Sequence, residues 1–360
     1  MNKKLLFVCP FPYGVQAGQR LKYEQHFKLF EKNNYEITIN SFIDNDTYKI
    51  LYKKGFLIKK IYSLIKGYFK RIFLIRKLKK FDIVYIFMWV TPYFGNSFEK
   101  IYINRSNKSI FDMEDNVLMK TSNNLKIISN FIKSSKKINY LIKKSDHIIT
   151  STPALGRKVE EISKKKKWTY ISPTIDINRF IKINNNIDDN LITIGWTGTF
   201  SSMKYLEIIK PVIIKISKVR KIKFLIISNS FYKIKDVNCE FIYWTKKNEI
   251  SDLSKIDIGV YPLPLEDEWV VGKSGLKTLQ YMAMGIASVS SEVGNIRDII
   301  ENMQDGVLVK TLNDWYNKLL LLIDNKDLRT DIGNKAKHKI KNNFSIEAIN
   351  NKYLNIFNNL

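Results

Sequence analysis

Short runs of consecutive apolar residues recur along the chain, and segments with helical spacing separate them. In the first half such runs lie within Leu5–Cys9, Ile83–Phe87, Ser109–Phe111 and His147–Thr150, and Tyr35–Ile39 is a further predicted strand in which polar residues separate the apolar ones. Unbroken apolar runs of this length are typical of strands that are buried on both faces of a parallel sheet. Their alternation with helical segments therefore predicts a parallel sheet with helices packed against it.

The same alternation begins again after a polar stretch at residues 181–190, which we interpret as a linker between domains. The later runs are Leu191–Gly195, Lys223–Ser228, Glu240–Tyr243, Asp257–Tyr261 and Ala287–Ser290. Helices are expected between them, notably at Gly275–Met284, and from Asp314 to Leu360. The pattern predicts an α/β chain with one Rossmann-like domain over residues 1–182 and another over 191–338. A last helix at 339–360 is expected to pack back on the first domain.

The composition fits a two-domain protein of the cytoplasm. The chain has 360 residues, of which 45% are apolar, so it can build two substantial cores. Its two cysteines, Cys9 and Cys239, are far apart and lack metal-ligand spacing, which favours a reducing compartment and no metal site. The apolar run near the N-terminus is too short for a signal peptide, and no stretch approaches the ~18 uncharged apolar residues of a membrane span.

The net charge of +26 points to an anionic partner, although an excess of lysine also arises by compositional drift in AT-rich genomes. Clustering separates the two explanations better than the total does. Between Leu51 and Lys80 there are eleven Lys or Arg residues and no acidic residue. Apolar residues recur at roughly helical spacing between them: Leu57, Ile61, Leu64, Ile65, Tyr68 and Ile72.

This segment is expected to form a basic amphipathic helix that lies on an anionic membrane surface, so that the protein is peripheral on the inner face of the cell membrane. The alternative is a helix whose apolar face packs on the core of the first domain. A second basic stretch, Lys126–Lys144, has the same character, and for it we favour the packing interpretation.

The segment from Asp257 to Val309 carries the strongest functional pattern. It is expected to form strand, loop, helix, strand, loop and helix in turn, with Gly272, Lys273, Ser274 and Gly275 directly before the first helix. A helix N-terminus exposes unpaired N–H groups and a partial positive charge, and a lysine beside it adds a full charge. The pattern indicates a phosphate site, although an ordinary β-α-β unit with a glycine-rich turn has similar spacing.

The same segment resembles the donor-binding half of retaining family 4 glycosyltransferases, which have the GT-B fold of two Rossmann-like domains that face a central cleft. The matching positions are Gly275-Leu276, Tyr281-Met282-Ala283, Gly285, Glu292-Val293-Gly294 and Asp305-Gly306-Val307-Leu308-Val309. The resemblance implies a hexosyltransferase-like enzyme that takes a sugar from a nucleotide diphosphate sugar. It further implies retention of anomeric configuration, no cofactor and no bound metal.

The chain departs from this family at two acidic positions. The family's paired glutamates fall at Gly272 and Gln280 here. Gln280 can still hold the ribose hydroxyls, because an amide both donates and accepts hydrogen bonds. The glutamate that contacts the transferred sugar is missing, and Glu268 in the same loop is a candidate replacement. Alternatively, Glu268 and its acidic neighbours are solvated surface charges.

Other candidate donor-site residues follow the strand that opens the second domain. We interpret Gly198 and Thr199 as backbone donors to the diphosphate, with Lys273 and Lys277 supplying positive charge and Ser274 next to them. The resemblance is to family members that use small hydroxyl residues in this loop. A plain tight turn after the strand is the competing interpretation.

In the first domain, Gly18 and Arg20 lie in the loop and helix after the first strand and are candidates for an acceptor or phosphate contact. A surface arginine is the alternative for Arg20. Glu114 and Asp115 follow another strand, where the family commonly has a His-Asp pair, and with Glu268 they are our candidate catalytic residues. Helix capping is the alternative for these two carboxylates.

The predicted function is therefore transfer of a sugar to a glycan or lipid-linked acceptor, in bacterial surface polysaccharide synthesis. Two rival functions remain open at this point. One is a sugar-nucleotide epimerase on the same fold, and the other is a basic nucleic-acid-binding protein. No segment resembles a recognition helix, and aromatic residues do not form a stacking platform among the basic runs, so we expect no nucleic acid partner.

Overall fold

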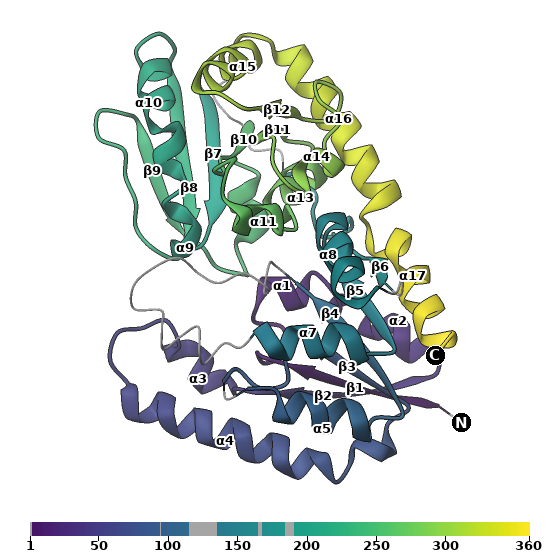
Figure 1. The fold of residues 1–360 in the computed structure, drawn as a ribbon. Coiled ribbons are helices and arrows are strands. Elements are labelled where there is room, and N and C mark those ends of the chain that lie inside the picture. Colours follow the sequence, from purple (N-terminus) through teal and green to yellow (C-terminus); the bar gives the residue numbers. More distant parts are fainter. Residues whose placement is uncertain (1, 94, 115–134, 165–167, 184–190) are drawn as a thin grey trace. The chain divides into compact units, whose positions relative to one another are not determined.

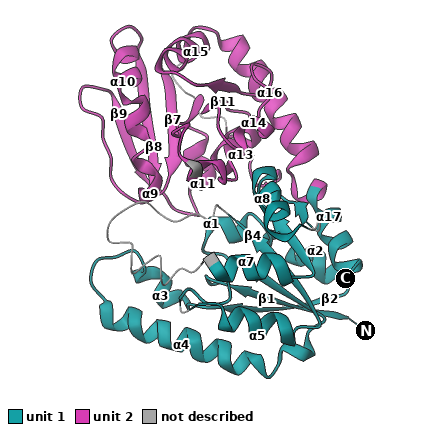
Figure 2. Cartoon of the chain, in the orientation of Figure 1, with its two compact units in different colours: residues 1–174, 349–360 teal, residues 175–348 magenta. Residues whose placement is uncertain are grey.

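The computed structural model describes residues 2–93, 95–114, 135–164, 168–183 and 191–360 (Figure 1). They form two compact units, one of residues 1–174 with 349–360 and one of residues 175–348 (Figure 2). Each unit is built on its own six-stranded sheet. The α/β class that the alternation of apolar runs predicts is confirmed.

Unit 1 contains a sheet in the order β2-β1-β3-β4-β5-β6, and every pairing among its described strands is parallel. The strands are β1 (Lys3–Cys9), β2 (Tyr35–Ser41), β3 (Ile83–Phe87), β4 (Lys108–Met113), β5 (His147–Thr150) and β6 (Trp168–Tyr170). The first five coincide with predicted strands. Strand β6 is not among the predicted strands, because its three residues form no apolar run; all three are half buried.

Helices pack on both faces of this sheet, and side chains of β1 alternate between two cores. Leu5 and Phe7 face one core, and Leu6 and Val8 face the other. The helical elements are α1 (Ala17–Arg20), η1 (Glu24–His26), α2 (Phe27–Lys32), α3 (Asn45–Ile50), α4 (Leu57–Ile75), η2 (Leu78–Lys80), α5 (Ser97–Arg105), α7 (Ser135–Lys144), α8 (Pro153–Ser163) and most of α17 (Ile346–Asn358). The helical segment expected after the first strand is divided into α1, η1 and α2.

The second basic stretch packs against the sheet, as we favoured. Within α7, Ile138, Leu141 and Ile142 are buried in one core of unit 1. Its Lys137 is buried as well and donates to the carbonyl of Thr91 at 2.6 Å. The part of this stretch before Ser135 lies outside the described residues.

Helix α4 packs differently from α7, because most of its apolar side chains face solvent. Its buried positions are Ser63, Gly67, Arg71 and Leu74, whereas most of its large apolar side chains are exposed. The interpretation in which its apolar face packs on the core is therefore wrong. Arg71 is also not part of the basic surface, because it is fully buried.

The end of the chain belongs to unit 1. Tyr353 and Phe357 of α17 pack against Phe30 in the core that also covers β1 and β3. His26 connects α17 to Thr174, the last residue of the segment 1–174. Its Nδ1 lies 2.6 Å from Asn350 Oδ1, and its Nε2 lies 3.0 Å from Thr174 Oγ1.

Unit 2 contains a second sheet, in the order β9-β8-β7-β10-β11-β12, again with parallel pairings among the described strands. The strands are β7 (Ile192–Gly198), β8 (Ile222–Ser228), β9 (Cys239–Tyr243), β10 (Ile258–Tyr261), β11 (Ala287–Ser291) and β12 (Val307–Val309). Numbered from β7, this is the order 3-2-1-4-5-6 of a dinucleotide-binding Rossmann sheet.

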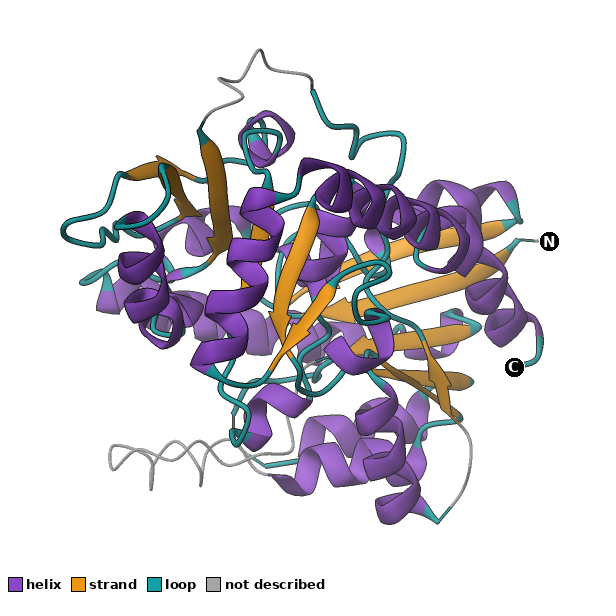
Figure 3. Cartoon of the chain, turned by 90° about the horizontal axis from the view of Figure 1, so that it is seen from above, coloured by secondary structure: helices purple, strands orange, loops and turns teal. Residues whose placement is uncertain are grey.

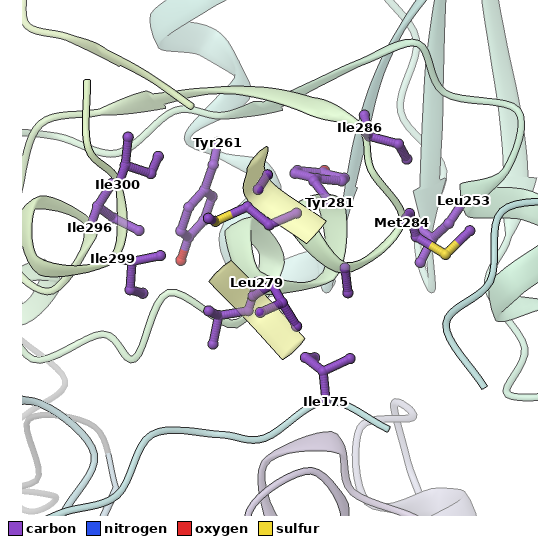
Figure 4. Close-up of a cluster of buried hydrophobic side chains, with 14 of the residues drawn as sticks. Ile175, Leu253, Tyr261, Leu279, Tyr281, Met284, Ile286, Ile296, Ile299 and Ile300 are labelled. Atoms are coloured by element: carbon purple, nitrogen blue, oxygen red, sulfur yellow. The ribbon is translucent and has the colours of Figure 1, made fainter. Parts of the chain in front are cut away.

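Helices cover both faces of this sheet too (Figure 3). They are α9 (Phe200–Met203), α10 (Leu206–Ser217), α11 (Glu249–Leu253), α12 (Glu268–Val271), α13 (Leu276–Ala283), α14 (Ile296–Ile299), α15 (Leu312–Asp324) and α16 (Lys326–Asn343). Leu279 and Tyr281 of α13 lie at the centre of one core (Figure 4). On the opposite face, Trp315 of α15 and Ile213 of α10 fill the other core.

Unit 2 begins at Ile175, before the polar stretch that the sequence analysis takes as the linker. Ile175 and Phe180 are fully buried in the core of unit 2. The backbone N–H of Ile175 also donates to the carbonyl of Phe344 at 2.8 Å. These apolar contacts hold residues 175–180 in the second unit, and residues 184–190 lie outside the described part of the chain.

Unit 1 is expected to lose stability in mild acid because of His26. Burial lowers the pKa of His26 to about 4, whereas an unfolded histidine titrates near 6.5. Between these values the unfolded chain binds a proton that the folded chain does not, so stability falls as the pH drops from about 6.5 to 4, by on the order of 3 kcal/mol.

Urea unfolding of the wild type and of His26→Gln across this pH range measures the effect. The variant is expected to be less stable near neutral pH and to show a flatter pH dependence. His338→Gln, at an exposed position on α16, is the matched control and should keep the wild-type slope. An unchanged slope in His26→Gln would contradict the prediction.

Candidate functional site

The sheet of unit 2 reverses its strand order between β7 and β10. From β7 the chain continues outward through β8 and β9, and it then returns to place β10 on the other side of β7. The loops that leave the carboxyl ends of β7 and β10 consequently run in opposite directions. In open α/β sheets, ligands bind in the crevice at such a switch point.

Tyr281 of α13 separates the two strands at this point. The β7–β10 pairing covers only Ile194 with Ile258 and Gly195 with Gly259. Beyond it, the backbone N–H of Thr197 donates to the Tyr281 hydroxyl at 2.9 Å instead of to a strand. The Tyr281 ring can lie there only because Gly259 has no side chain, since a Cβ on Gly259 would approach the ring to 2.5 Å.

Lys277, in the first turn of α13, reaches the carboxyl ends of both strands. Its Nζ lies 4.9 Å from the ring centroid of Tyr261, which ends β10, and 6.0 Å from that of Trp196 in β7. A Cβ on Gly198 would come within 2.8 Å of Lys277 Cε and 2.3 Å of the Trp196 ring. The structure therefore brings Gly198 and Lys277 together, and it explains the glycine by the packing of these two side chains.

The loop before α13 supplies further polar groups. Gly275 is the N-cap residue at φ +78°, and among the described side chains none caps this helix end. Ser274 is held in place because Asn295 Nδ2 donates to its carbonyl at 2.9 Å. Lys273 and Leu276 are half buried beside it. An eight-residue helix that begins without a side-chain cap and has Lys277 in its first turn is suited to an anion.

Thr199 and Gln280 occupy different surroundings. Thr199 is exposed, is the N-cap residue of α9, and has its hydroxyl 2.9 Å from that of Ser201. Gln280 is buried on α13 and donates from Nε2 to Glu249 Oε1 at 3.3 Å. The other oxygen of Glu249 accepts from Arg179 at 2.7 Å. Glu249 therefore places a carboxylate directly beside Gln280, the position at which the resembling family carries its own glutamate.

In unit 1, the buried Lys22 contacts one candidate carboxylate, Glu114, together with Asp112 in β4. Lys22 Nζ lies 2.7 Å from Asp112 Oδ1 and 3.2 Å from Glu114 Oε2, and Tyr85 donates to the other oxygen of Asp112. Burial disfavours the ammonium, but Asp112 and Glu114 together raise the pKa of Lys22 above its usual value. Burial raises the pKa of the Asp112 carboxyl group, although the Lys22 ammonium opposes that shift.

The remaining candidates of unit 1 lie on the loop and helix after β1. Arg20 is buried at the end of α1, so the surface alternative for this residue is wrong. Gly18 packs against the side chain of Gln16, which caps the same helix. Asp115 lies outside the described residues. In unit 2, Glu268 begins α12, and its side chain is likewise outside the described part of the chain.

No three His, Cys, Asp or Glu side chains within the described ranges come together as a metal site. A cavity of about 290 Å³ lies elsewhere in unit 2, lined in part by Ile192, Arg220 and Arg329. Ile192 begins β7, so this cavity lies at the amino ends of the strands. The switch point at the carboxyl ends is the better candidate for chemistry.

Most of unit 2 matches a family of known proteins. Residues 192–325 match the family "Glycosyl transferases group 1". Unit 2 carries a glycosyl transferases group 1 domain. Lys277, Gly198 and the start of α13 all lie within this domain.

Curated relatives match over a short region. Trehalose synthase of Thermococcus litoralis is 36% identical over 84 residues, which are 23% of this chain and 20% of that protein. Poly(ribitol-phosphate) alpha-N-acetylglucosaminyltransferase of Staphylococcus aureus is 30% identical over 96 residues, again 23% of this chain and 20% of that protein. The matched region thus spans about one fifth of the length of these relatives.

Solved structures resemble the chain over a larger part of its length. Anabaena HepE in complex with UDP-glucose has a TM-score of 0.69 at 13% identity, and the match covers 99% of this chain and 100% of that one. S. aureus TarM has a TM-score of 0.59 at 19% identity, covering 80% of this chain and 58% of TarM. The fold is GT-B, as the sequence analysis predicted.

The sequence assigned no specific role in these sites to Lys22, Glu249 or Tyr281. Lys22 and Glu249 are one lysine and one glutamate among many charged residues, and no spacing links either to its partner. Tyr281 was matched to the family, but its place between β7 and β10 depends on Gly259, more than 20 residues earlier. A glycine inside a strand does indicate a close approach by another group, and that signal was present at Gly259.

The separation of β7 and β10 by Tyr281 can be tested by substitution. Gly259→Ala is expected to destabilise unit 2 by about 1–3 kcal/mol, because its new Cβ collides with the Tyr281 ring. Urea unfolding measures this loss. In a Tyr281→Ala background the same substitution should cost much less, because the ring is gone. Equal costs in the two backgrounds would show that the ring does not lie against Gly259.

Proposed function

We propose that the chain is a retaining glycosyltransferase of family 4, hexosyltransferase-like, that moves a sugar from a nucleotide diphosphate sugar to a glycan or lipid-linked acceptor. The observation that carries this proposal is the position of Lys277. Its ammonium lies at the switch point of a Rossmann sheet, beside an uncapped helix N-terminus and within a glycosyl transferases group 1 domain.

In this proposal the diphosphate binds at the start of α13. Lys273 and Lys277 contribute full positive charges, and the N–H groups that follow Gly275 contribute a partial one. Gly198 and Thr199 would contact the phosphates from the end of β7. These groups would compensate the charge that develops on the departing diphosphate, so we expect the reaction to need no cofactor and no bound metal.

Gln280 and Glu249 are proposed to hold the ribose together. The contact between their side chains places an amide and a carboxylate at one point of α13 and α11. A vicinal diol both donates and accepts hydrogen bonds, which this pair can satisfy. Glu249 would then supply the acceptor capacity that Gln280 alone lacks by comparison with a glutamate.

Retention is proposed to proceed by departure and attack on the same face of the sugar. The bond from C1 to the diphosphate oxygen breaks, the acceptor oxygen bonds to C1, and the acceptor proton passes to the departing phosphate. The protein then acts mainly by positioning and charge compensation. Glu114, Asp115 and Glu268 remain the proposed residues for contacts to the acceptor and the transferred sugar, with Lys22 holding the Glu114 carboxylate in position.

The proposed role is in the synthesis of a bacterial surface polymer. It is supported by the S. aureus relative, which by its name acts on poly(ribitol-phosphate). The neighbouring structures of HepE and TarM were solved with UDP-glucose and with UDP, respectively. UDP is therefore the first nucleotide to test, and a panel of nucleotide sugars follows from it.

The nucleotide site can be tested by comparing UDP with uridine, or with the corresponding pair for whichever nucleotide binds. Lys277→Ala and Lys273→Ala should each weaken binding of the diphosphate roughly ten- to hundred-fold, because a charge-assisted contact is worth about 1.5–3 kcal/mol. Binding of the nucleoside should change little. Gln280→Ala should weaken the nucleoside and the nucleotide alike. Isothermal calorimetry gives both affinities.

Lys215→Ala is the matched control for Lys277→Ala. Lys215 also lies over an aromatic ring, 3.9 Å from the centroid of Tyr316, but on α10 and α15. Its variant is expected to bind UDP like the wild type. If both Lys273→Ala and Lys277→Ala also bind like the wild type, the diphosphate does not bind at α13.

The transferase reaction itself predicts that free nucleotide diphosphate appears only when an acceptor is present. An epimerase on the same fold would instead change the sugar nucleotide without any acceptor. The product should also keep the anomeric configuration of the donor, which proton NMR of the new linkage reads directly. Acceptor-independent turnover would favour the epimerase, and an inverted product would refute retention.

A further inference from the structure

Helix α4 presents an apolar face to solvent. Seven side chains that share one side of the helix are exposed: Ile58, Ile61, Tyr62, Ile65, Phe69, Ile72 and Phe73. Ile58 is 85% exposed and Phe73 is 64% exposed. At 3.6 residues per turn these positions form one continuous stripe, and the 19-residue helix is about 28 Å long. A contiguous exposed patch of this kind marks a binding surface.

The opposite side of α4 is fixed to the sheet by small and polar residues. Gly67 lies against the ring of Phe42, which a Cβ would approach to 2.6 Å. Arg71 is fully buried and donates to the carbonyls of Val90 at 2.8 Å and of Cys9 at 2.9 Å. A third carbonyl, that of Asn40, accepts from Arg71 at 2.8 Å. The helix therefore cannot turn its apolar stripe inward without losing these bonds.

Basic residues flank the apolar stripe. Lys59, Lys66 and Lys70 follow one edge of α4, and exposed Lys or Arg residues continue past its end. No acidic residue occurs between positions 51 and 80. Lys66 is paired with Asp44 at 2.9 Å, and the charges of Lys59, Arg76, Lys77, Lys79 and Lys80 lie on exposed side chains. A partner must therefore offer an apolar layer bordered by negative charge.

We propose that α4 docks in the interface of an anionic lipid bilayer, with its axis parallel to the membrane plane. A bilayer interface offers acyl chains to the stripe and phosphate headgroups to the lysines, and aromatic residues such as Tyr62 and Phe69 suit its boundary. Within the described residues no helix is long and apolar enough to cross a membrane. The protein would lie on the surface and not span it.

Arg71 links this docking helix to the carboxyl ends of three strands of unit 1. Cys9 ends β1, Asn40 lies near the end of β2, and Val90 follows β3, so all three acceptor carbonyls lie at the carboxyl ends of the strands. The strand order of unit 1 reverses between β1 and β3. Docking through α4 would hold this end of the sheet near the lipid surface. On the proposed function, the acceptor would then be carried by a lipid.

Co-sedimentation with vesicles tests the docking. The full chain should bind vesicles that contain phosphatidylglycerol and bind poorly to pure phosphatidylcholine. Ile58→Ser and Phe73→Ser should each weaken binding roughly ten-fold, because each removes an apolar side chain from the buried layer. Lys59→Gln and Lys77→Gln should each weaken it about five-fold, and high salt should reduce only this charge-dependent part.

Phe231→Ser is the matched control. Phe231 is 63% exposed on unit 2 and has an aromatic neighbour, as Phe73 does, so its loss should not alter vesicle binding. Arg71 is unsuitable as a probe, because its replacement would disturb the strand ends. Circular dichroism and the melting temperature are to be measured for each variant at an exposed position, to check that it remains folded.

Failure to bind phosphatidylglycerol vesicles at low salt overturns the proposal. Vesicle binding that neither Ile58→Ser nor Phe73→Ser weakens overturns it as well. A solution dimer that Ile58→Ser converts to a monomer, without vesicle binding, would assign the stripe to a second copy of the chain. The assay uses neither donor nor acceptor. It can therefore fail while the transferase proposal stands, and it can succeed while that proposal fails.

Discussion

The separation of β7 from β10 is the constraint on which the candidate donor site depends. Two parallel strands pair along their full length unless something occupies the space between their ends. Here the Tyr281 ring lies over Gly259, and its hydroxyl takes the Thr197 N–H that would otherwise need a strand partner. Tyr281 belongs to α13, so the same packing contact that opens the strand ends also brings Lys277 and the helix N-terminus to them.

Buried cations fix the corresponding edge of unit 1. Arg71 gathers carbonyls from three strand ends, and Lys22 joins the carboxylates of Asp112, near the end of β4, and Glu114, directly after it. A buried charge is tolerated only when its partners satisfy it, and removing one partner of such a pair typically costs several kcal/mol. These two residues therefore hold irregular backbone and acidic side chains in fixed positions.

The two surfaces of α4 show how a single helix can serve structure and binding together. Its inner side relies on Ser63, Gly67, Arg71 and a single buried leucine, Leu74. Most of its other apolar residues are consequently available for a partner outside the chain. The hydrogen bonds of Arg71 join this helix to backbone carbonyls at the carboxyl ends of β1, β2 and β3.

The sequence by itself determined the class of the fold and the region of the donor site. Apolar runs buried on both faces leave a local pattern, and ten of the twelve strands follow from it; β6 was missed for lack of such a run, and β12 was seen only as a family match. The segment around Lys273 and Gly275 was found because glycine, lysine and a helix start lie next to each other in the chain. The tertiary structure decided the rest. The partners of Gln280, Glu114 and Arg71 come from distant segments, so no spacing records them. The direction in which the apolar side of α4 faces was also left open, because helical periodicity gives the stripe but not the side on which the sheet lies. Gly67 and Arg71 set that side, since only a small residue and a cation with several carbonyl partners fit against the strand ends.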